Sequence, residues 1–321
     1  MRFRPLAALS AAAVAALLLA GCASGQGTAQ PTGTAAADLC AAQAAPGAAS
    51  DSVTVDGEVG KPSKATFKTP LEPKNLQVTV LDEGKGESVK PGQFVSYAMS
   101  AYNAKSGDEL ATVGYKEGEF LPSQLSASTV LGQVFGCGKV GKRVVATFPA
   151  TDTAQAEVYV LDLLGTVPTA AWGTPQDAPA DFPKVALEKN GAPKITIPKG
   201  EDPPTATKIA TLKKGDGYTV KKGDYALIQY TGVRWSNGKT FDSTWEKGGG
   251  TPIAYPTTQY VPGFQKALEG QTVGSQVLVV IPPAEGYGEG KINEADLKGE
   301  TIVFVVDILG AQSATAGSPA E

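Results

Sequence analysis

The chain has 321 residues, 42% of them hydrophobic, which is enough for two domains of ordinary size. Its formal net charge of −4, with both signs interspersed, argues against a nucleic-acid partner, which would require a concentrated basic face. The chain contains no histidine and three cysteines, which excludes Ser-His, Cys-His and His-metal sites, zinc clusters and a disulfide-dense scaffold.

The first 22 residues have the features of an export signal. Two arginines precede an apolar run from Leu6 to Ala20, which is too short for a membrane span, and small residues then precede Cys22. The tetrapeptide Leu19-Ala-Gly-Cys22 resembles the lipobox of bacterial lipoproteins. This resemblance implies cleavage before Cys22, lipidation of that residue and an extracytoplasmic protein anchored to the bacterial cell membrane. An ordinary signal peptide with an incidental cysteine is the alternative.

Residues 23–50 are rich in Ala, Gly, Ser, Thr and Gln, and this composition predicts a flexible tether. Cys40 lies within it. If Cys22 is lipidated, Cys40 and Cys137 are the remaining thiols of an exported protein, and we expect a disulfide between them. Two unpaired buried cysteines are the alternative.

The rest of the chain contains an internal repeat. Residues 81–92 align without a gap to residues 212–223, an offset of 131, and the similarity continues on both sides. We therefore expect two copies of one fold, over residues 51–166 and 182–312. The Pro-containing stretch 167–181 is the predicted linker, and residues 313–321 form a predicted disordered tail.

The second repeat contains strand, helix and strand signals in close succession. Alternation predicts strands over Tyr225–Gly232, with Ala226, Ile228 and Tyr230 on one face, and over 301–309, with Ile302, Phe304 and Val306 on one face. The apolar run 277–281 is a further predicted strand, and Val261–Gly270 has Pro262 and Gly270 at the ends of a short helix. The pattern predicts an α+β fold in which a curved antiparallel sheet wraps around one helix and leaves an apolar hollow.

At this point the last hundred residues resemble the FK506-binding protein (FKBP) family of peptidyl-prolyl isomerases. The matching motifs occur in the same order as in the family: Tyr-Thr-Gly (230–232), Phe-Asp-Ser (241–243), Val-Pro-Gly-Phe (261–264), Ile-Pro-Pro-Ala-Glu-Gly-Tyr-Gly (281–288) and Val-Phe-Val-Val-Asp-Ile-Leu (303–309). The resemblance implies that each copy is an FKBP-like domain.

The resemblance also assigns roles to residues around the proline-sized hollow. Tyr287 is expected to donate a hydrogen bond to the substrate carbonyl, and Asp242 to lie where the displaced carbonyl swings, to order Tyr230 or to polarise the amide. Phe264 is the expected floor. The full set comprises the catalytic candidates Asp242, Tyr287, Tyr230, Phe241 and Phe304, and the substrate-binding candidates Val261, Phe264, Ile281, Ile253, Tyr260 and Leu297.

Several positions depart from the family pattern. Ile253 replaces a pocket aromatic, Phe264 a common tryptophan, and Gln259-Tyr260 a common Glu-Val pair. Leu297 is the candidate for the apolar flap contact, in a loop without the usual Ile-Pro-Pro. These departures weaken the expectation that FK506-like macrolides bind.

The first copy lacks the side chains that the resemblance assigns to catalysis. Met99, Leu110 and Ala111 stand at the positions of Tyr230, Phe241 and Asp242. Phe148 and Tyr159 are separated by 11 steps, against 23 between Ile281 and Phe304, which leaves no counterpart of Tyr287.

Together these observations predict a surface lipoprotein whose second copy isomerises X-Pro bonds in exported or unfolded proteins, with no cofactor and no metal. A non-catalytic holdase that grips Pro-containing segments is the alternative. The pair Asp242 and Tyr287 distinguishes the two, because a binder has no need of both.

Overall fold

The computed structural model describes residues 38–246, 250–288 and 297–316. The predicted export signal with Cys22 and the first part of the predicted tether lie outside these residues, as do residues 317–321 of the predicted tail. Among the residues described, none of the helices has the length and apolarity needed to span a lipid bilayer.

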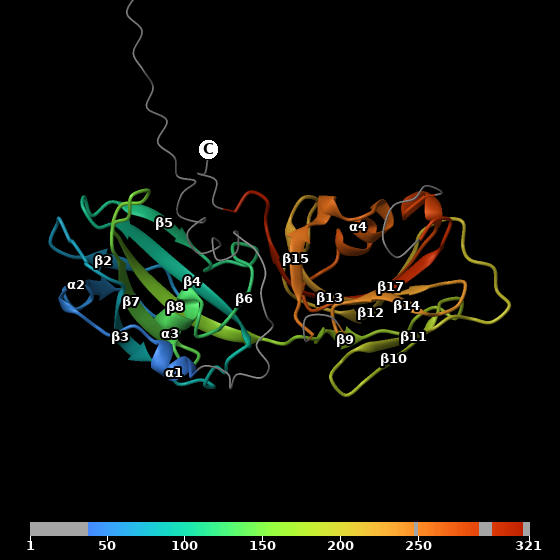
Figure 1. Cartoon of the computed structure of the whole chain (residues 1–321), viewed down its shortest axis with the longest axis horizontal. Helices are drawn as coiled ribbons and strands as arrows, with labels where there is room; N and C mark the ends of the chain where they lie inside the picture. Colours follow the sequence, from blue (N-terminus) through green and yellow to red (C-terminus); the bar gives the residue numbers. More distant parts are fainter. Residues whose placement is uncertain (1–37, 247–249, 289–296, 317–321) are drawn as a thin grey trace, which may run out of the picture. The chain divides into compact units, whose positions relative to one another are not determined.

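The chain divides into two compact units. The unit of the first copy comprises residues 38–119, 123–166 and 315–316 of the described chain, and that of the second copy Phe120–Pro122 and Val167–Ala314. Each has its own antiparallel sheet and its own short helix, as the fold class predicts (Figure 1).

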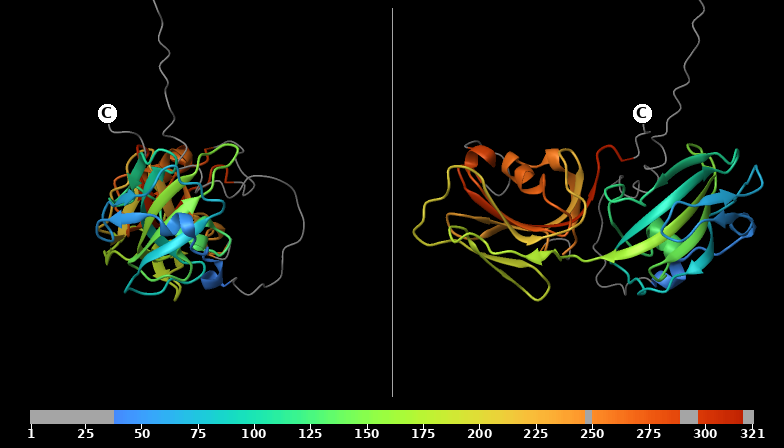
Figure 2. Two further views of the ribbon diagram at one scale, coloured as in Figure 1. Left: turned by 90° about the vertical axis from the view of Figure 1, so that its left-hand side faces the viewer. Right: turned by 180° about the vertical axis from the view of Figure 1, so that it is seen from behind.

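The sheet of the second copy wraps around helix α4 (Figure 2). Its strand order is β14-β13-β17-β16-β12-β9, and β15 pairs with β13. The elements are β9 (Thr174–Pro175), β12 (Lys208–Lys214), β13 (Tyr225–Arg234), β14 (Thr240–Ser243), β15 (Ile253–Pro256), the 3-10 turn η3 (Thr257–Gln259), α4 (Pro262–Leu268), β16 (Gln276–Ile281), the 3-10 turn η4 (Pro283–Glu285) and β17 (Ile302–Gln312).

Both faces of this sheet are covered. Ile302, Phe304 and Val306 of β17 belong to the core that includes α4, as their predicted alternation requires. Val303 and Val305 belong to a second core on the opposite face, beneath the hairpin of β10 (Lys184–Leu187) and β11 (Pro193–Thr196). The second core explains why every residue of β16 is buried.

The first copy has the same topology. Its strand order is β3-β7-β8-β4-β5, β6 pairs with β4, and a β1–β2 hairpin stands in the place of β10–β11. The elements are β1 (Thr54–Asp56), β2 (Lys64–Thr66), β3 (Gln77–Glu83), β4 (Phe94–Asn103), β5 (Glu109–Val113), β6 (Ser123–Gln124), α3 (Val130–Phe135), β7 (Lys142–Phe148) and β8 (Glu157–Val167).

The strand registers of the two copies agree with the repeat. Ala101 pairs with Ala111 in the first copy and Gly232 with Asp242 in the second, an offset of 131 on both strands, and a bulge follows each pair. The end of the repeat is also reproduced, because Tyr159 opposes Ala146 as Phe304 opposes Val279.

The predicted tether is wrong for residues 38–50. This segment forms α1 (Leu39–Ala42) and α2 (Ala48–Asp51), and Leu39 is 2% exposed. The expected disulfide between Cys40 and Cys137 is present, with the two Cα atoms 4.6 Å apart. The segment is ordered because this crosslink and the buried leucine hold α1 against α3, which weak local propensity does not reveal.

The predicted linker is also largely part of the second copy. β9 pairs with β12, and the backbone amide of Ala171 donates to the Asp307 carboxylate at 2.9 Å while its carbonyl accepts from Lys213. At the other end, the Ala314 amide donates to Asp224, so order continues past residue 312. Hydrogen bonds to buried partners, rather than hydrophobic periodicity, fix these segments.

Candidate active site

Aromatic rings from four elements of the second copy meet on the face of the sheet that α4 covers. The ring centroid of Phe304 lies 4.9 Å from Phe264, 5.4 Å from Phe241 and 5.8 Å from Tyr230, each in an edge-to-face arrangement. Phe264 also stacks on Tyr260 at 4.7 Å. These geometries are favourable for aromatic pairs, so the cluster is packed in a defined way.

Two glycines make this close packing possible. A Cβ atom on Gly232 would lie 2.5 Å from the ring of Phe304 and 2.8 Å from that of Phe241, and one on Gly263 would lie 2.4 Å from Ile281. Neither glycine was among the predicted site residues. The signal was present in the words Tyr-Thr-Gly and Val-Pro-Gly-Phe, but the steric reason requires the strand register and the helix position.

A carboxylate lies at the edge of the cluster. The Tyr230 hydroxyl donates to Oδ2 of Asp242 at 2.6 Å. Burial raises the pKa of Tyr230 well above its usual value, and the adjacent Asp242 charge raises it further. Tyr230 therefore remains a hydrogen-bond donor at any ordinary pH.

The loop after β16 brings Tyr287 to the same cluster. Ile281 is completely buried at the end of the strand, η4 follows, and the Gly288 amide donates to the Pro283 carbonyl at 2.7 Å to close the turn. Half-buried Tyr287 packs against the core that contains Phe264 and Phe304. The turn thus places a tyrosine beside the aromatic rings.

The remaining predicted residues lie around the same core. Val261 occupies the N-cap position of α4, Ile253 pairs with Ile228 across β15 and β13, and Leu297 is 1% exposed. With Asp242 joined through Tyr230, the structure brings together all of the predicted site residues of this copy: Tyr230, Phe241, Asp242, Ile253, Tyr260, Val261, Phe264, Ile281, Tyr287, Leu297 and Phe304.

The equivalent face of the first copy is filled differently. Met99, at the position of Tyr230, is 1% exposed, and Ala101 replaces Gly232. Around the helix the two copies are related by an offset of 133, because the helix-ending hydrogen bonds of Gly136 and Glu269 correspond. This offset places Leu131 where the second copy has Phe264. Tyr159 donates its hydroxyl to the nearby Glu157, not to a carboxylate on the neighbouring strand. The first copy, which the structure describes throughout residues 38–166, lacks the arrangement found in the second.

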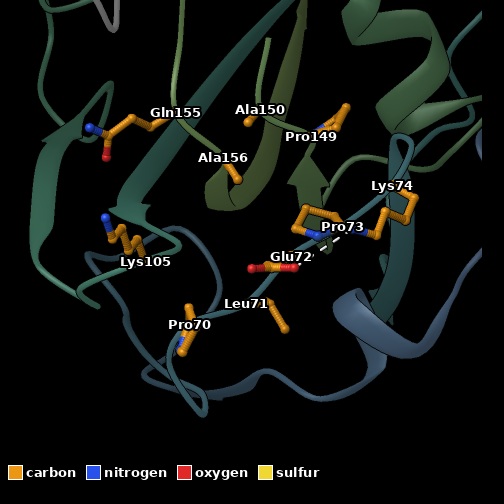
Figure 3. Close-up of a pocket in the computed structure, with 10 residues that line it drawn as sticks. All are labelled: Pro70, Leu71, Glu72, Pro73, Lys74, Lys105, Pro149, Ala150, Gln155 and Ala156. Atoms are coloured by element: carbon orange, nitrogen blue, oxygen red, sulfur yellow. Dashed lines mark ion pairs between the residues drawn. The ribbon is translucent and has the colours of Figure 1, made fainter.

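A pocket of about 600 Å³ lies beside the shortened loop of the first copy (Figure 3). It begins at Pro149, the counterpart of Pro282, where the second copy continues into η4 and Tyr287. None of its lining residues is equivalent to a member of the aromatic cluster. They are Pro70, Leu71, Glu72, Pro73, Lys74, Lys105, Pro149, Ala150, Gln155 and Ala156.

No cluster of three or more His, Cys, Asp or Glu side chains suitable for a metal ion occurs within the described parts of the chain. The cluster of the second copy offers instead an apolar surface with a hydroxyl and a carboxylate at its margin. Such a surface is suited to an apolar ring attached to a polar backbone.

Comparison with known proteins agrees with this geometry. Residues 217–309 match the family described as FKBP-type peptidyl-prolyl cis-trans isomerase. An FK506-binding protein from Streptomyces anulatus is 32% identical over 132 residues, covering 39% of this chain and 98% of that protein. A probable FK506-binding protein from Corynebacterium glutamicum is 32% identical over 120 residues, covering 37% and 98%. Among solved structures, FkpA from Escherichia coli is similar at 25% identity and a TM-score of 0.32, covering 36% of this chain and 54% of that one. Because the family model matches residues 217–309 and both FK506-binding proteins are similar over 98% of their length, the chain belongs to the family of FKBP-type peptidyl-prolyl cis-trans isomerases.

Proposed function

We propose that the second copy catalyses cis-trans isomerisation of X-Pro bonds in exported proteins, and that the first copy does not. The observation that carries the proposal is the difference between the copies. Tyr230, Asp242, Phe264 and Tyr287 surround one apolar cluster in the second copy, whereas the first copy keeps the strand registers without these side chains.

The chemistry requires no bond to the enzyme. Rotation about an X-Pro amide is opposed by a barrier of roughly 18–20 kcal/mol and takes on the order of 10–100 s without a catalyst. In the twisted amide the charge-separated resonance form is lost. An apolar surface therefore disfavours the planar ground state relative to the twisted state, which is the differential binding that catalysis needs.

The described side chains suit this task. Phe264 is 2% exposed and rigidly stacked between other rings, so it can support the proline ring as a floor. Tyr287 supplies a hydroxyl near the cluster for the carbonyl next to the proline. Asp242, held by Tyr230, supplies a fixed negative charge at the margin of the cluster, where it can interact with the electron-poor carbonyl carbon as the carbonyl turns out of the amide plane.

The proposed location follows from the N-terminal sequence. Lipid on Cys22 would hold the protein at the outer side of the bacterial cell membrane, where newly exported chains fold. The disulfide between Cys40 and Cys137 supports export, because disulfides persist in oxidising compartments. Mass analysis of the membrane fraction should find a lipidated Cys22 at the N-terminus, and an unmodified cleaved terminus would contradict the anchor.

A protease-free assay of X-Pro isomerisation with the intact two-copy protein tests the activity. We expect Tyr287→Phe and Asp242→Ala to lower kcat/KM, while Tyr159→Phe, which removes a buried hydroxyl from the first copy, leaves it unchanged. Unaltered rates in both second-copy variants would overturn the catalytic assignment. A wild-type protein that binds Pro-containing peptides without accelerating isomerisation would instead be a holdase.

A further inference from the structure

The side chain of Glu285 joins three segments next to the candidate site. Its Oε2 atom accepts a hydrogen bond from Lys266 Nζ at 2.7 Å and another from Thr207 Oγ1 at 2.6 Å. Lys266 lies in the last turn of α4, Thr207 immediately precedes β12, and Glu285 is the last residue of η4. A single carboxylate thus links the loop, the helix and the start of a strand.

Two of these segments carry the groups proposed to act on the substrate. Tyr287 follows Glu285 by two residues, and Phe264 precedes Lys266 by two. The loop is internally stiff, because the amides of Glu285, Gly286 and Gly288 donate to the carbonyls of Pro282 and Pro283. We call the contacts of Glu285 with Lys266 and Thr207 the junction. Because the turn is stiff and is held at Glu285, the position of Tyr287 two residues later is fixed as well, and the junction sets the position of the loop relative to α4.

The first copy has lost the members of this junction. The position of Thr207 is taken by Leu76 at the offset of 131, and that of Lys266 by Gln133 at the offset of 133 seen around the helix. The loop that would hold the glutamate is missing as well. If the junction served only to stabilise the fold, the first copy would have equal use for it.

We infer that Glu285 is a positioning residue for the isomerisation, holding the Tyr287 loop against α4 at the separation the twisted amide requires. This inference rests on the proposed function. The hydrogen bonds from Lys266 and Thr207 lower the pKa of Glu285, so the carboxylate is charged at neutral pH. The junction acts through Tyr287 and does not itself contact the reacting bond.

Steady-state kinetics of Glu285→Ala and Lys266→Met in the full-length protein test the role. We expect kcat and kcat/KM to fall together by roughly three- to tenfold, which is the effect of one partly exposed, charge-assisted contact realised in the transition state. Lys266→Arg should restore most of the rate. The double variant should be no slower than either single variant, because both changes break one junction.

The matched control is Lys208→Met. Lys208, on β12, forms an ion pair of 2.6 Å with Asp181 in the same copy, with side chains 45% and 58% exposed. The control and Lys266→Met should have similar unfolding midpoints but different rates. Equal rates in the two variants, or a rate loss explained by unfolding at the assay temperature, would overturn the inference.

Hydrogen exchange at the amides of Glu285 and Gly288 gives a readout that does not depend on activity. In Glu285→Ala we expect these amides to exchange roughly three- to tenfold faster, with the amides of β16 unchanged. Unchanged loop exchange would refute the positioning role. An inactive wild-type protein, or an unaffected Tyr287→Phe variant, would instead refute the proposed function and leave this second readout valid.

Discussion

Replacing Tyr230 by phenylalanine tests the part of the site that the structure defines best. The ring keeps its edge-to-face contacts, at 5.8 Å to Phe304 and 6.0 Å to Phe264, and loses only the hydroxyl that donates to Asp242 at 2.6 Å. A hydrogen bond to a charged group contributes about 1.5–3 kcal/mol. If this bond orients Asp242 in the transition state, kcat/KM should fall roughly ten- to a hundredfold.

The assay combines protease-free kinetics with urea unfolding of the same variant, so that a loss of stability is separated from a loss of rate. Tyr255→Phe is the control, because Tyr255 is 48% exposed on the neighbouring strand β15. Because the pKa of Tyr230 is raised, its hydroxyl keeps its proton and its hydrogen bond at every pH below the usual tyrosine pKa. The bond is lost only as the pH rises through the pKa of the folded protein. The ratio of wild-type to variant kcat/KM should therefore be constant from neutral to mildly alkaline pH. A variant that keeps more than half of the wild-type kcat/KM would refute the idea that Tyr230 orients Asp242 for catalysis.

Three further predictions concern stability. Replacing Cys40 and Cys137 together by serine opens a crosslink across 97 residues of sequence and should cost the first copy about 2–4 kcal/mol in urea unfolding; a loss below about 1 kcal/mol would contradict it. Arg143→Gln breaks a buried ion pair with Asp162 and the bonds from the guanidinium to the carbonyls of Gly57, Glu58 and Lys61, and should cost about 3–5 kcal/mol by the same measurement. Wild-type stability in that variant would show that the pair does not hold the β1–β2 hairpin. Tyr260→Phe removes a buried hydroxyl that has no hydrogen-bond partner among the residues the structure describes. The change should leave the unfolding free energy unchanged or raise it by up to about 1 kcal/mol, and a clear decrease would contradict this prediction.

Much of the fold and the site was predictable because it depends on the spacing of residues within single strands and within the helix. The alternation of β17 assigned Ile302, Phe304 and Val306 to one face, and they do belong to one core. The motifs contain the ring residues, which lie on the predicted strands or in the first turn of the predicted helix: Tyr230 on β13, Phe241 on β14, Phe304 on β17 and Phe264 on α4. Leu297 was foreseen as an apolar contact of the flap, and it is buried in the same core.

The features that were missed depend on partners far away in sequence. Leu39 is surrounded by small residues in the sequence, and only the contact with α3 and the disulfide show that it is buried. The order around Ala171 depends on Asp307, more than a hundred residues later. The junction at Glu285 needs three separate segments. The hydrophobic periodicity of a short segment gives no information about such long-range contacts.

The second hydrophobic core beneath each hairpin separates the stability of each copy from the side chains on its helix side. In both copies a core that includes residues such as Val145 or Val305 lies on the face of the sheet turned away from the helix. Mutations that remodel the helix side therefore leave an independent scaffold intact. The two copies differ in the side chains on the helix side while they share one architecture, and the same separation would let an engineer redesign the helix side of the second copy while the opposite core stays unchanged.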